Sequence, residues 1–284
     1  MDFFDRAYVI NLPQRTDRRA EITRELKKAD MPLEAGKVEL VTAIRPEVAF
    51  PFKSIGAKGA FLSHLKVLKM AKAANLKNVL IIEDDLQFTP DFKAYETALI
   101  TELASQDWDL VQFGYCTRGH NPNCELGAPL LQDFAGENTG AHCYAVNGKV
   151  LKQLIHFLEA LLKDAIRHKR SAMSIDGAFN VFKWRNAEAN RLITTRCFAS
   201  QRSSASDIST CWFDQTPGLR QAARVARKVP GVSPVVRFAR RQGLAPIKQW
   251  LGTAAKLIQS AQSTQPVPPH QGIAPQPSNC HSIG

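Results

Sequence analysis

The apolar runs of this chain are short, and their length limits what it can fold into. The most apolar run, residues 79–82, is followed directly by Glu83, Asp84 and Asp85. A membrane-spanning helix needs about 20 consecutive apolar residues, so no conventional transmembrane anchor is expected. A run of this size before charged residues is typical of a buried strand in a globular domain.

Residues 1–215 alternate between strand-like and helix-like segments. We expect strands at residues 7–12, 37–42, 78–82, 108–113 and 144–146, and helices at 17–29, 56–75, 91–105, about 147–168 and 175–184. This alternation predicts an α/β domain with a largely parallel sheet. The stretch 114–139 is rich in Gly, Pro and Asn and is expected to form a substrate lid.

The formal charge of +11 is concentrated near the C-terminus. Nine Lys and Arg residues and no acidic residue follow Asp214, and subtracting these nine leaves +2 for the remainder. Residues 216–263 are expected to form a basic amphipathic helical extension. It suits an anionic membrane surface, and the alternative is a solvated hairpin packed on the domain. Residues 264–284, rich in Pro, Gln and Ser, predict a disordered tail.

Nucleic acid is not the expected partner of this basic extension. Its charged segments contain only two aromatic residues, Phe238 and Trp250, whereas proteins that bind single strands stack bases on several aromatic rings. The N-terminal residues 1–6 carry charges and no apolar signal core. The expected location is therefore the cytoplasm, with at most peripheral attachment to the cytoplasmic membrane face.

The acidic triplet is the sharpest functional feature. Three carboxylates at the carboxyl end of a buried strand repel one another, so a positive partner is expected there. Mn²⁺ or Mg²⁺ fits, held by one or two carboxylates and by substrate phosphates. Because side chains alternate along an extended chain, Glu83 and Asp85 are expected to share the metal, with Asp84 on the other side. The alternatives are a solvated turn and carboxylates that cap the helix after Pro90.

Two other segments carry groups that suit an anion. Arg15 and Arg18 follow the first strand and are placed to meet a diphosphate, although a solvent-facing basic helix is an alternative. Glycines open the helix at residues 56–66, where Ser63 and His64 add donors one turn later. A structural role is the alternative for His64. The glycine patterns of dinucleotide and P-loop sites are missing.

Taken together, these segments resemble glycosyltransferase family 25, the lipooligosaccharide and collagen galactosyltransferase-like group. The matching pieces are YVINLPQRTDRR at 8–19, KGAFLSHL at 58–65, VLIIEDDL at 79–86, WDLVQFG at 108–114, TGAHCYAVNGKVLKQLI at 139–155 and SQRSSASDIS at 200–209. The resemblance implies a GT-A-like, nucleotide-sugar-binding Rossmann-type domain at residues 1–215, to which the basic helical extension is added.

The resemblance also implies an activity and assigns residues to it. The activity is inverting, metal-dependent transfer of a hexose, typically galactose from UDP-galactose, onto a glycan such as a lipooligosaccharide or lipid-linked oligosaccharide. Glu83, Asp84 and Asp85 match the acidic metal motif; Asn11, Arg15 and Arg18 match the nucleotide-side motif; Ser63 and His64 match the Ser-His pair.

The acceptor hydroxyl needs a carboxylate base near it. Asp176, at the start of the helix expected after the lid, is the first candidate, and Glu137 and Asp109 are its rivals. For Asp176 the alternative is simple capping of that helix. A competing interpretation of the whole chain is a catalytically inactive module that binds a nucleotide sugar for recognition or scaffolding, and nucleic-acid binding through the basic tail ranks below it.

Overall fold

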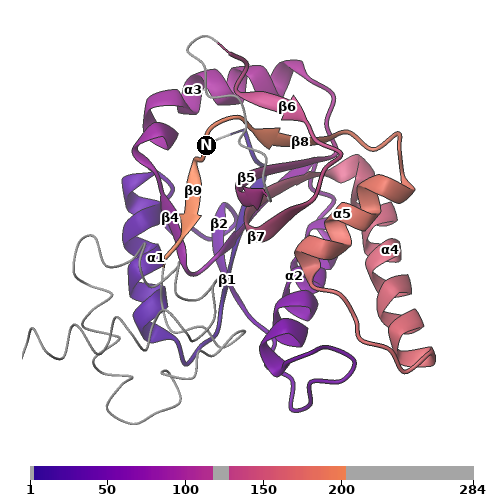
Figure 1. Cartoon of the computed structure of the whole chain (residues 1–284). Helices are drawn as coiled ribbons and strands as arrows, with labels where there is room; N and C mark the ends of the chain where they lie inside the picture. The colour runs from indigo at the N-terminus through magenta and orange to yellow at the C-terminus, as the bar shows by residue number, and fades with distance from the viewer. Residues whose placement is uncertain (1–2, 118–127, 203–284) are drawn as a thin grey trace, which may run out of the picture. The chain divides into compact units, whose positions relative to one another are not determined.

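The structure is a computed structural model that describes residues 3–117 and 128–202. Helices and strands alternate along most of it (Figure 1). In chain order the elements are β1 (Arg6–Asn11), α1 (Thr16–Lys28), β2 (Val38–Thr42), α2 (Ile55–Ala73), β3 (Asn78–Glu83), β4 (Leu86–Phe88), α3 (Pro90–Ser105), β5 (Leu110–Thr117), β6 (Leu131–Asp133), β7 (Asn138–Asn147), α4 (Gly148–Arg167), α5 (Ile175–Arg185), β8 (Arg191–Thr194) and β9 (Ala199–Gln201).

One sheet organises these elements, in the strand order β2-β1-β3-β7-β5-β8-β6. Strand β1 pairs in parallel with β2 and β3, and β5 pairs in parallel with β8. Strand β7 runs antiparallel to both β3 and β5, and β6 runs antiparallel to β8. The other strands of this sheet therefore point one way, and the predicted α/β class with a largely parallel sheet is confirmed. Strands β4 and β9 form a separate antiparallel pair.

The sheet is covered on both faces, which explains the continuous apolar run in β3. Leu80 and Ile82 belong to the core under α1 and α3, whereas Val79 and Ile81 belong to the core under α2, α4 and α5. All four side chains are fully buried. A strand with helices on both faces has no solvent side, so apolar residues do not alternate with polar ones.

The segment expected as a lid contains more regular structure than its composition indicates. Strand β5 continues to Thr117, β6 lies within the stretch, and β7 begins at Asn138 rather than at Tyr144. The prediction of one long loop over residues 114–139 is therefore wrong, because its two ends belong to β5 and β7 and β6 lies between them. Buried polar residues hide these strands from a search for apolar runs: Asn138 and His142 are almost completely buried.

Several predictions concern residues that the structure does not describe. The extension at 216–263, the tail at 264–284 and the boundary near 215 lie outside the described residues, as do residues 118–127. Among the helices of residues 3–117 and 128–202, none combines the length and hydropathy that crossing a bilayer requires.

Candidate active site

The acidic triplet lies at the carboxyl end of β3, next to the carboxyl end of β1. Parallel pairing sets Ile10 opposite Glu83, so Asn11 at the end of β1 reaches the triplet. The Asn11 Nδ2 donates to Asp84 Oδ2 at 2.7 Å. Arg18, in the first turn of α1, donates from Nη1 to Asp84 Oδ1 at 2.9 Å, and the same nitrogen lies 3.3 Å from Asp85 Oδ2. The structure thus brings Asn11 and Arg18 to the triplet, and their predicted role toward a diphosphate stays a prediction.

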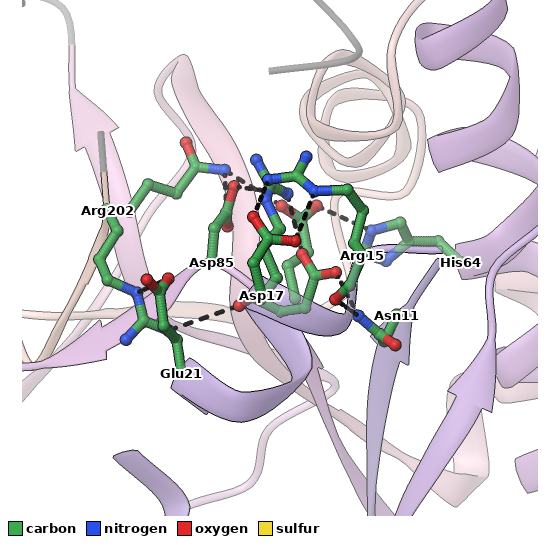
Figure 2. A network of polar contacts seen from close by, with 11 residues as sticks. Asn11, Arg15, Asp17, Glu21, His64, Asp85 and Arg202 are labelled. Carbon is green, nitrogen blue, oxygen red and sulfur yellow. Dashed lines mark hydrogen bonds and ion pairs between the residues drawn. The ribbon is translucent and has the colours of Figure 1, made fainter. Parts of the chain in front are cut away.

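Strand β9 completes this cluster from more than a hundred residues away (Figure 2). The Gln201 Nε2 donates to Glu83 Oε2 at 3.1 Å and to Asp85 Oδ1 at 3.5 Å. The backbone N–H of Arg202 donates to the Asp85 carbonyl at 2.7 Å. Glu83 and Asp85 therefore share one partner, as their predicted common side requires. Sequence reasoning gave Gln201 and Arg202 no role, although both lie in a segment that resembles the family.

His64 connects helix α2 to the triplet. Its Nε2 lies 3.0 Å from Glu83 Oε1, and its Nδ1 lies 2.9 Å from Tyr144 Oη. A neutral imidazole satisfies both contacts when Nε2–H donates to Glu83 and Nδ1 accepts from the phenol. Burial raises the pKa of Tyr144 well above its ordinary value, and the charge of Glu83 adds to this, so the phenol keeps its proton. His64 and Tyr144 thereby orient Glu83.

Ser63 has a different environment from its neighbour. Its buried hydroxyl donates to the Gly59 carbonyl at 2.6 Å and accepts from the Ile44 N–H at 2.8 Å. Gly59 is needed for the same packing, because an added Cβ would lie 2.6 Å from the Ile44 carbonyl oxygen. Both residues fasten α2 to the chain that follows β2. These contacts supply a packing reason for part of the glycine-rich helix start.

Sequence reasoning also missed His142, which is buried beside β9. Its Nε2 lies 3.2 Å from the Ala199 carbonyl, which can only accept, so Nε2 carries the proton. The ring fits because Gly114 and Gly140 lack side chains: a Cβ at Gly114 would lie 2.2 Å from Nε2. The two glycines are a signal of this packing, but the signal is readable only once the strands are paired.

The pKa values of two carboxyl groups of the triplet, those of Glu83 and Asp85, are shifted in opposite directions. Burial and the charge of Glu83 raise the pKa of Asp85 to about 7, although Arg18 acts in the opposite direction. Burial alone would also raise the pKa of Glu83, but hydrogen bonds from His64 and Gln201 help to lower it below its usual value. The negative charge of ionised Asp85 is therefore only partly compensated by its neighbours.

This donor set fits a hard divalent cation. Glu83 and Asp85 offer carboxylate oxygens on one side of the cluster, and the amide of Gln201 also carries an oxygen. Within the described ranges, no three or more His, Cys, Asp or Glu side chains form a ready-made metal cage. Mg²⁺ is commonly held by one or two carboxylates with substrate phosphates and water, which does not require such a cage.

The other predicted site residues do not all lie near the triplet. Arg15 pairs with Asp17 at 3.0 Å, and its carbonyl accepts from Asn11. Asp109 precedes β5 at the amino edge of the sheet, where it pairs with Lys149 at 3.3 Å, so the fold does not bring it to the triplet. Glu137 is exposed just before β7.

Asp176 joins α5 to the start of β7. Its Oδ2 accepts from the Gly140 N–H and its Oδ1 from the Gly177 N–H, each at 3.0 Å. Gly140 in turn borders His142, with its ideal Cβ position 3.1 Å from Nδ1. Asp176 is therefore positioned by backbone donors near His142, and its assignment as base stays a prediction.

Known proteins match this part of the chain. Residues 52–167 match the family model described as glycosyltransferase family 25 (LPS biosynthesis protein). Procollagen galactosyltransferase 1 of Danio rerio is 33% identical over 129 residues, which cover 39% of this chain and 21% of that protein. A glycosyltransferase 25 family member of Drosophila melanogaster is 29% identical over 127 residues, with the same two coverages of 39% and 21%. The chain thus spans about a fifth of the length of these relatives.

A solved structure also aligns with the chain. It is a glycosyltransferase involved in the glycosylation of the major capsid of PBCV-1, and the alignment covers 71% of this chain and 93% of that one, at 8% identity and a TM-score of 0.44. The sequence matches confirm the resemblance on which the site was predicted. Residues 52–167, which include His64, the acidic triplet and His142, are thus similar to glycosyltransferase family 25.

Proposed function

We propose that this protein is a glycosyltransferase that moves a hexose, galactose from UDP-galactose in the first instance, onto a hydroxyl of a glycan acceptor. The observation that carries the proposal is the contact of Glu83 and Asp85, which lie in the region that matches the family 25 model, with one side chain, Gln201, from outside that region. The acceptor class we favour is a lipooligosaccharide or another lipid-linked glycan. We propose inversion at the sugar carbon and dependence on Mn²⁺ or Mg²⁺.

Charge at the triplet supports binding of a nucleoside diphosphate. A divalent cation bound by Glu83 and Asp85 would neutralise negative charge that develops on the leaving diphosphate. Arg18 already lies within ion-pair distance of Asp84 and Asp85, and a guanidinium in this position would also attract an incoming phosphate. Asn11 holds Asp84 in place, so Arg18 keeps a fixed anchor while donor binds.

The acceptor side of the reaction needs a base across the sugar from the leaving group. Asp176 is the carboxylate we propose for this role, because backbone donors from Gly140 and Gly177 fix its orientation. Each carboxylate oxygen has a second lone pair, which leaves room to accept the proton of an acceptor hydroxyl.

Calorimetric titration of UDP and UDP-galactose, with and without Mn²⁺, tests the donor site. We expect cation-dependent binding that Asp85→Asn weakens at least tenfold. Asp107→Asn is the matched control, because it removes an exposed carboxylate that pairs with Lys149 at the other edge of the sheet. Equal binding by Asp85→Asn and wild type would remove the cation assignment, and no binding under any condition would remove the donor site.

One observation favours a second candidate, a catalytically inactive module that binds nucleotide sugar. Arg18 and Gln201 already compensate part of the charge of the triplet without a cation. Hydrolysis of UDP-galactose by the protein at micromolar concentration separates the two candidates. Measurable turnover that depends on Mn²⁺ supports the transferase, whereas tight donor binding with no turnover of donor, in the presence or absence of glycan acceptors, supports the module.

A further inference from the structure

Large apolar side chains are exposed mainly at one end of the domain. Among the described residues, the large hydrophobic side chains that are exposed are Val48, Phe50, Ile55, Ile166, Met173 and Trp184. The first five lie on the loop that leads into α2, at the end of α4 and on the loop between α4 and α5. These segments occupy the same end of the domain in Figure 1. We call these five residues the apolar end patch.

Hydrogen bonds hold the two loops of the apolar end patch together. The Ala172 N–H donates to the Pro51 carbonyl at 2.8 Å. The Lys58 Nζ donates to the Phe50 carbonyl at 2.7 Å and to the Val48 carbonyl at 3.1 Å. Phe52, between the exposed residues, turns inward instead. Phe50 stays 51% exposed although its backbone is anchored, so its exposure is a feature of the fold.

Basic residues outnumber acidic ones on the segments that carry the apolar end patch, and we call these basic residues its rim. They are Arg45, Lys53, Lys58, Arg167, Lys169 and Arg170, against the acidic Glu47 and Asp164 on the same segments. Asp164 is engaged by Arg170 and by His168. Clustered apolar side chains that are exposed mark a site of interaction, and a net positive charge on the same segments fits an anionic partner. The C-terminal extension of this chain has the same sign of charge and does not complement the rim.

We propose that the apolar end patch docks the enzyme on an anionic lipid membrane. Phe50, Val48 and Ile55 enter the boundary between headgroups and acyl chains, while the lysines and arginines of the rim contact lipid phosphates. This surface belongs to the folded domain and is distinct from the basic extension at residues 216–263. The proposal does not need the chain to be an active transferase.

The location of the patch also bears on the acceptor, and this step alone rests on the proposed function. Ile55 begins α2, and His64, which contacts Glu83, lies about 14 Å further along the same helix at a rise of about 1.5 Å per residue. A membrane at Ile55 would therefore hold the triplet within reach of a short glycan that projects from a lipid. The acceptor class that this geometry suits is a glycan attached to a lipid.

Vesicle flotation of the full chain tests the docking. We expect the wild type to float with vesicles of 30% phosphatidylglycerol in phosphatidylcholine, and the double variant Phe50→Ser/Ile55→Ser to partition at least tenfold less. Trp184→Gln is the matched control, because Trp184 is an exposed aromatic outside the patch and glutamine keeps an N–H for the Ala135 carbonyl. Lys53→Glu/Lys169→Glu should also lose binding, most strongly at low salt.

Hydrogen exchange of the full chain with and without these vesicles separates the patch from the basic extension. We expect protection at residues 46–55 and 166–174 in the wild type. Protection confined to residues after 214, or equal flotation of Phe50→Ser/Ile55→Ser and wild type, would overturn the proposal. Loss of a dimer in that double variant, measured by light scattering without lipid, would assign the patch to a second copy and also overturn it. Donor hydrolysis by the double variant should equal that of the wild type, so failure to dock and failure to catalyse are read separately.

Discussion

Asp84 and Asp85 are neighbours in sequence and share Arg18, yet their other contacts differ. Asp84 receives one hydrogen bond from Asn11 and one from Arg18, at 2.7 and 2.9 Å. Asp85 lies 3.3 Å from the same Arg18 nitrogen and receives a longer contact of 3.5 Å from Gln201. Asp84 is therefore held through both of its oxygens, and Asp85 is a carboxylate whose pKa is raised to about 7.

The raised pKa of Asp85 predicts a dependence of stability on pH. An unfolded carboxyl titrates near 3.8 and the folded one near 7, so between these values the folded protein binds more protons than the unfolded chain. The free energy of unfolding should fall as the pH rises from about 4 to 7 and then level off. The shift from 3.8 to about 7 corresponds to at most about 4 kcal/mol.

Urea unfolding at pH 4.5, 6 and 7.5 in the presence of a chelator measures this dependence. Asp85→Asn cannot ionise at this position and should lose the part of the slope that Asp85 contributes. Other groups titrate in the same range, so the quantity to compare is the difference between wild type and Asp85→Asn at each pH. A difference that does not change with pH would show that Asp85 ionises normally.

Substitution of Asp176 should separate sugar transfer to the acceptor from hydrolysis of the donor. Asp176→Asn keeps an oxygen for one of the two backbone donors but removes the negative charge that a base needs. We expect transfer to acceptor to fall by at least a hundredfold while donor hydrolysis stays within about threefold of wild type. Glu137→Gln removes a rival carboxylate and should leave both rates close to wild type. If Glu137→Gln lost transfer and Asp176→Asn kept it, the role would pass to Glu137.

At the scale of the element, β9 determines what surrounds the triplet. Its first residue accepts from His142, its last contributes the amide that Glu83 and Asp85 share, and its pairing with β4 fixes Gln201 opposite Leu86. A small displacement of this three-residue strand would move every contact that it makes with the site. Its position depends on the space left by Gly114 beneath the ring of His142.

Gly114→Ala should therefore act on the site through β9. The new Cβ would lie 2.2 Å from the His142 Nε2 and 2.9 Å from the Ala199 carbonyl oxygen, so the ring or the strand must shift. We expect a loss of about 1–3 kcal/mol in stability, the usual cost of overpacking, and weaker binding of UDP with Mn²⁺.

The matched control for Gly114→Ala is Gly177→Ala in the first turn of α5. Its nearest atom would be the Ser174 Oγ at 3.4 Å, an ordinary contact. Alanine also favours the helix, so this variant should be neutral or slightly more stable. Thermal melting and calorimetry compare the two variants, and equal behaviour would mean that Gly114 does not set the position of β9.

The elements that follow apolar periodicity could be predicted from the sequence, and the others could not. Helices α1 to α5 and strands β1 to β3 were expected within a few residues, because apolar side chains mark their buried faces. Strand β6 has only Leu131 buried among its three residues, and the start of β7 carries the buried but polar Asn138. Such strands are stabilised by hydrogen bonds from distant residues, which no local pattern records.

The residues of the site likewise fall into those that a local sequence pattern predicts and those that depend on long-range pairing. Glu83, Asp85, Asn11 and Arg18 lie at strand ends or just beyond them, and the rule that parallel strands end at one edge brings them together. Gln201 joins them through the pairing of β9 with β4, which is antiparallel and spans more than a hundred residues. Without that pairing, a glutamine in a polar stretch has no recognisable role.

At the scale of the whole molecule, Arg191 connects strands on the side of the sheet away from the triplet. It is almost completely buried, and its guanidinium donates to Gln112 Oε1 at 3.0 and 2.7 Å. It also donates to Asn138 Oδ1 and to the Gly136 carbonyl, and it lies over the ring of Phe134. Burial lowers its pKa to about 10, so it is still charged at neutral pH. One cation thus ties β8 to β5, to the start of β7 and to the chain before it.

Arg191→Ala should cost about 3–5 kcal/mol, because it leaves several buried acceptors without a donor as well as a cavity. Arg185→Ala, at an exposed position on α5, is the control and should change stability by less than about 0.5 kcal/mol. Urea unfolding compares the two. If Arg191→Ala lowered the free energy of unfolding by less than about 1 kcal/mol, water would be replacing the guanidinium, and the contacts of Arg191 would not be needed for the fold.

The milder Arg191→Lys extends this argument to activity. Lysine keeps the charge but lacks the fork that reaches Gln112 and Asn138 together, so the start of β7 should loosen while β1 and β3 stay in place. Gly140, two residues beyond Asn138, carries the N–H that orients Asp176, whereas Asn11 and Arg18 hold Asp84 from the other side of the sheet. We therefore expect Arg191→Lys to lower acceptor transfer more than donor binding. Equal losses in both would mean that the two halves of the site depend on the sheet as one rigid unit.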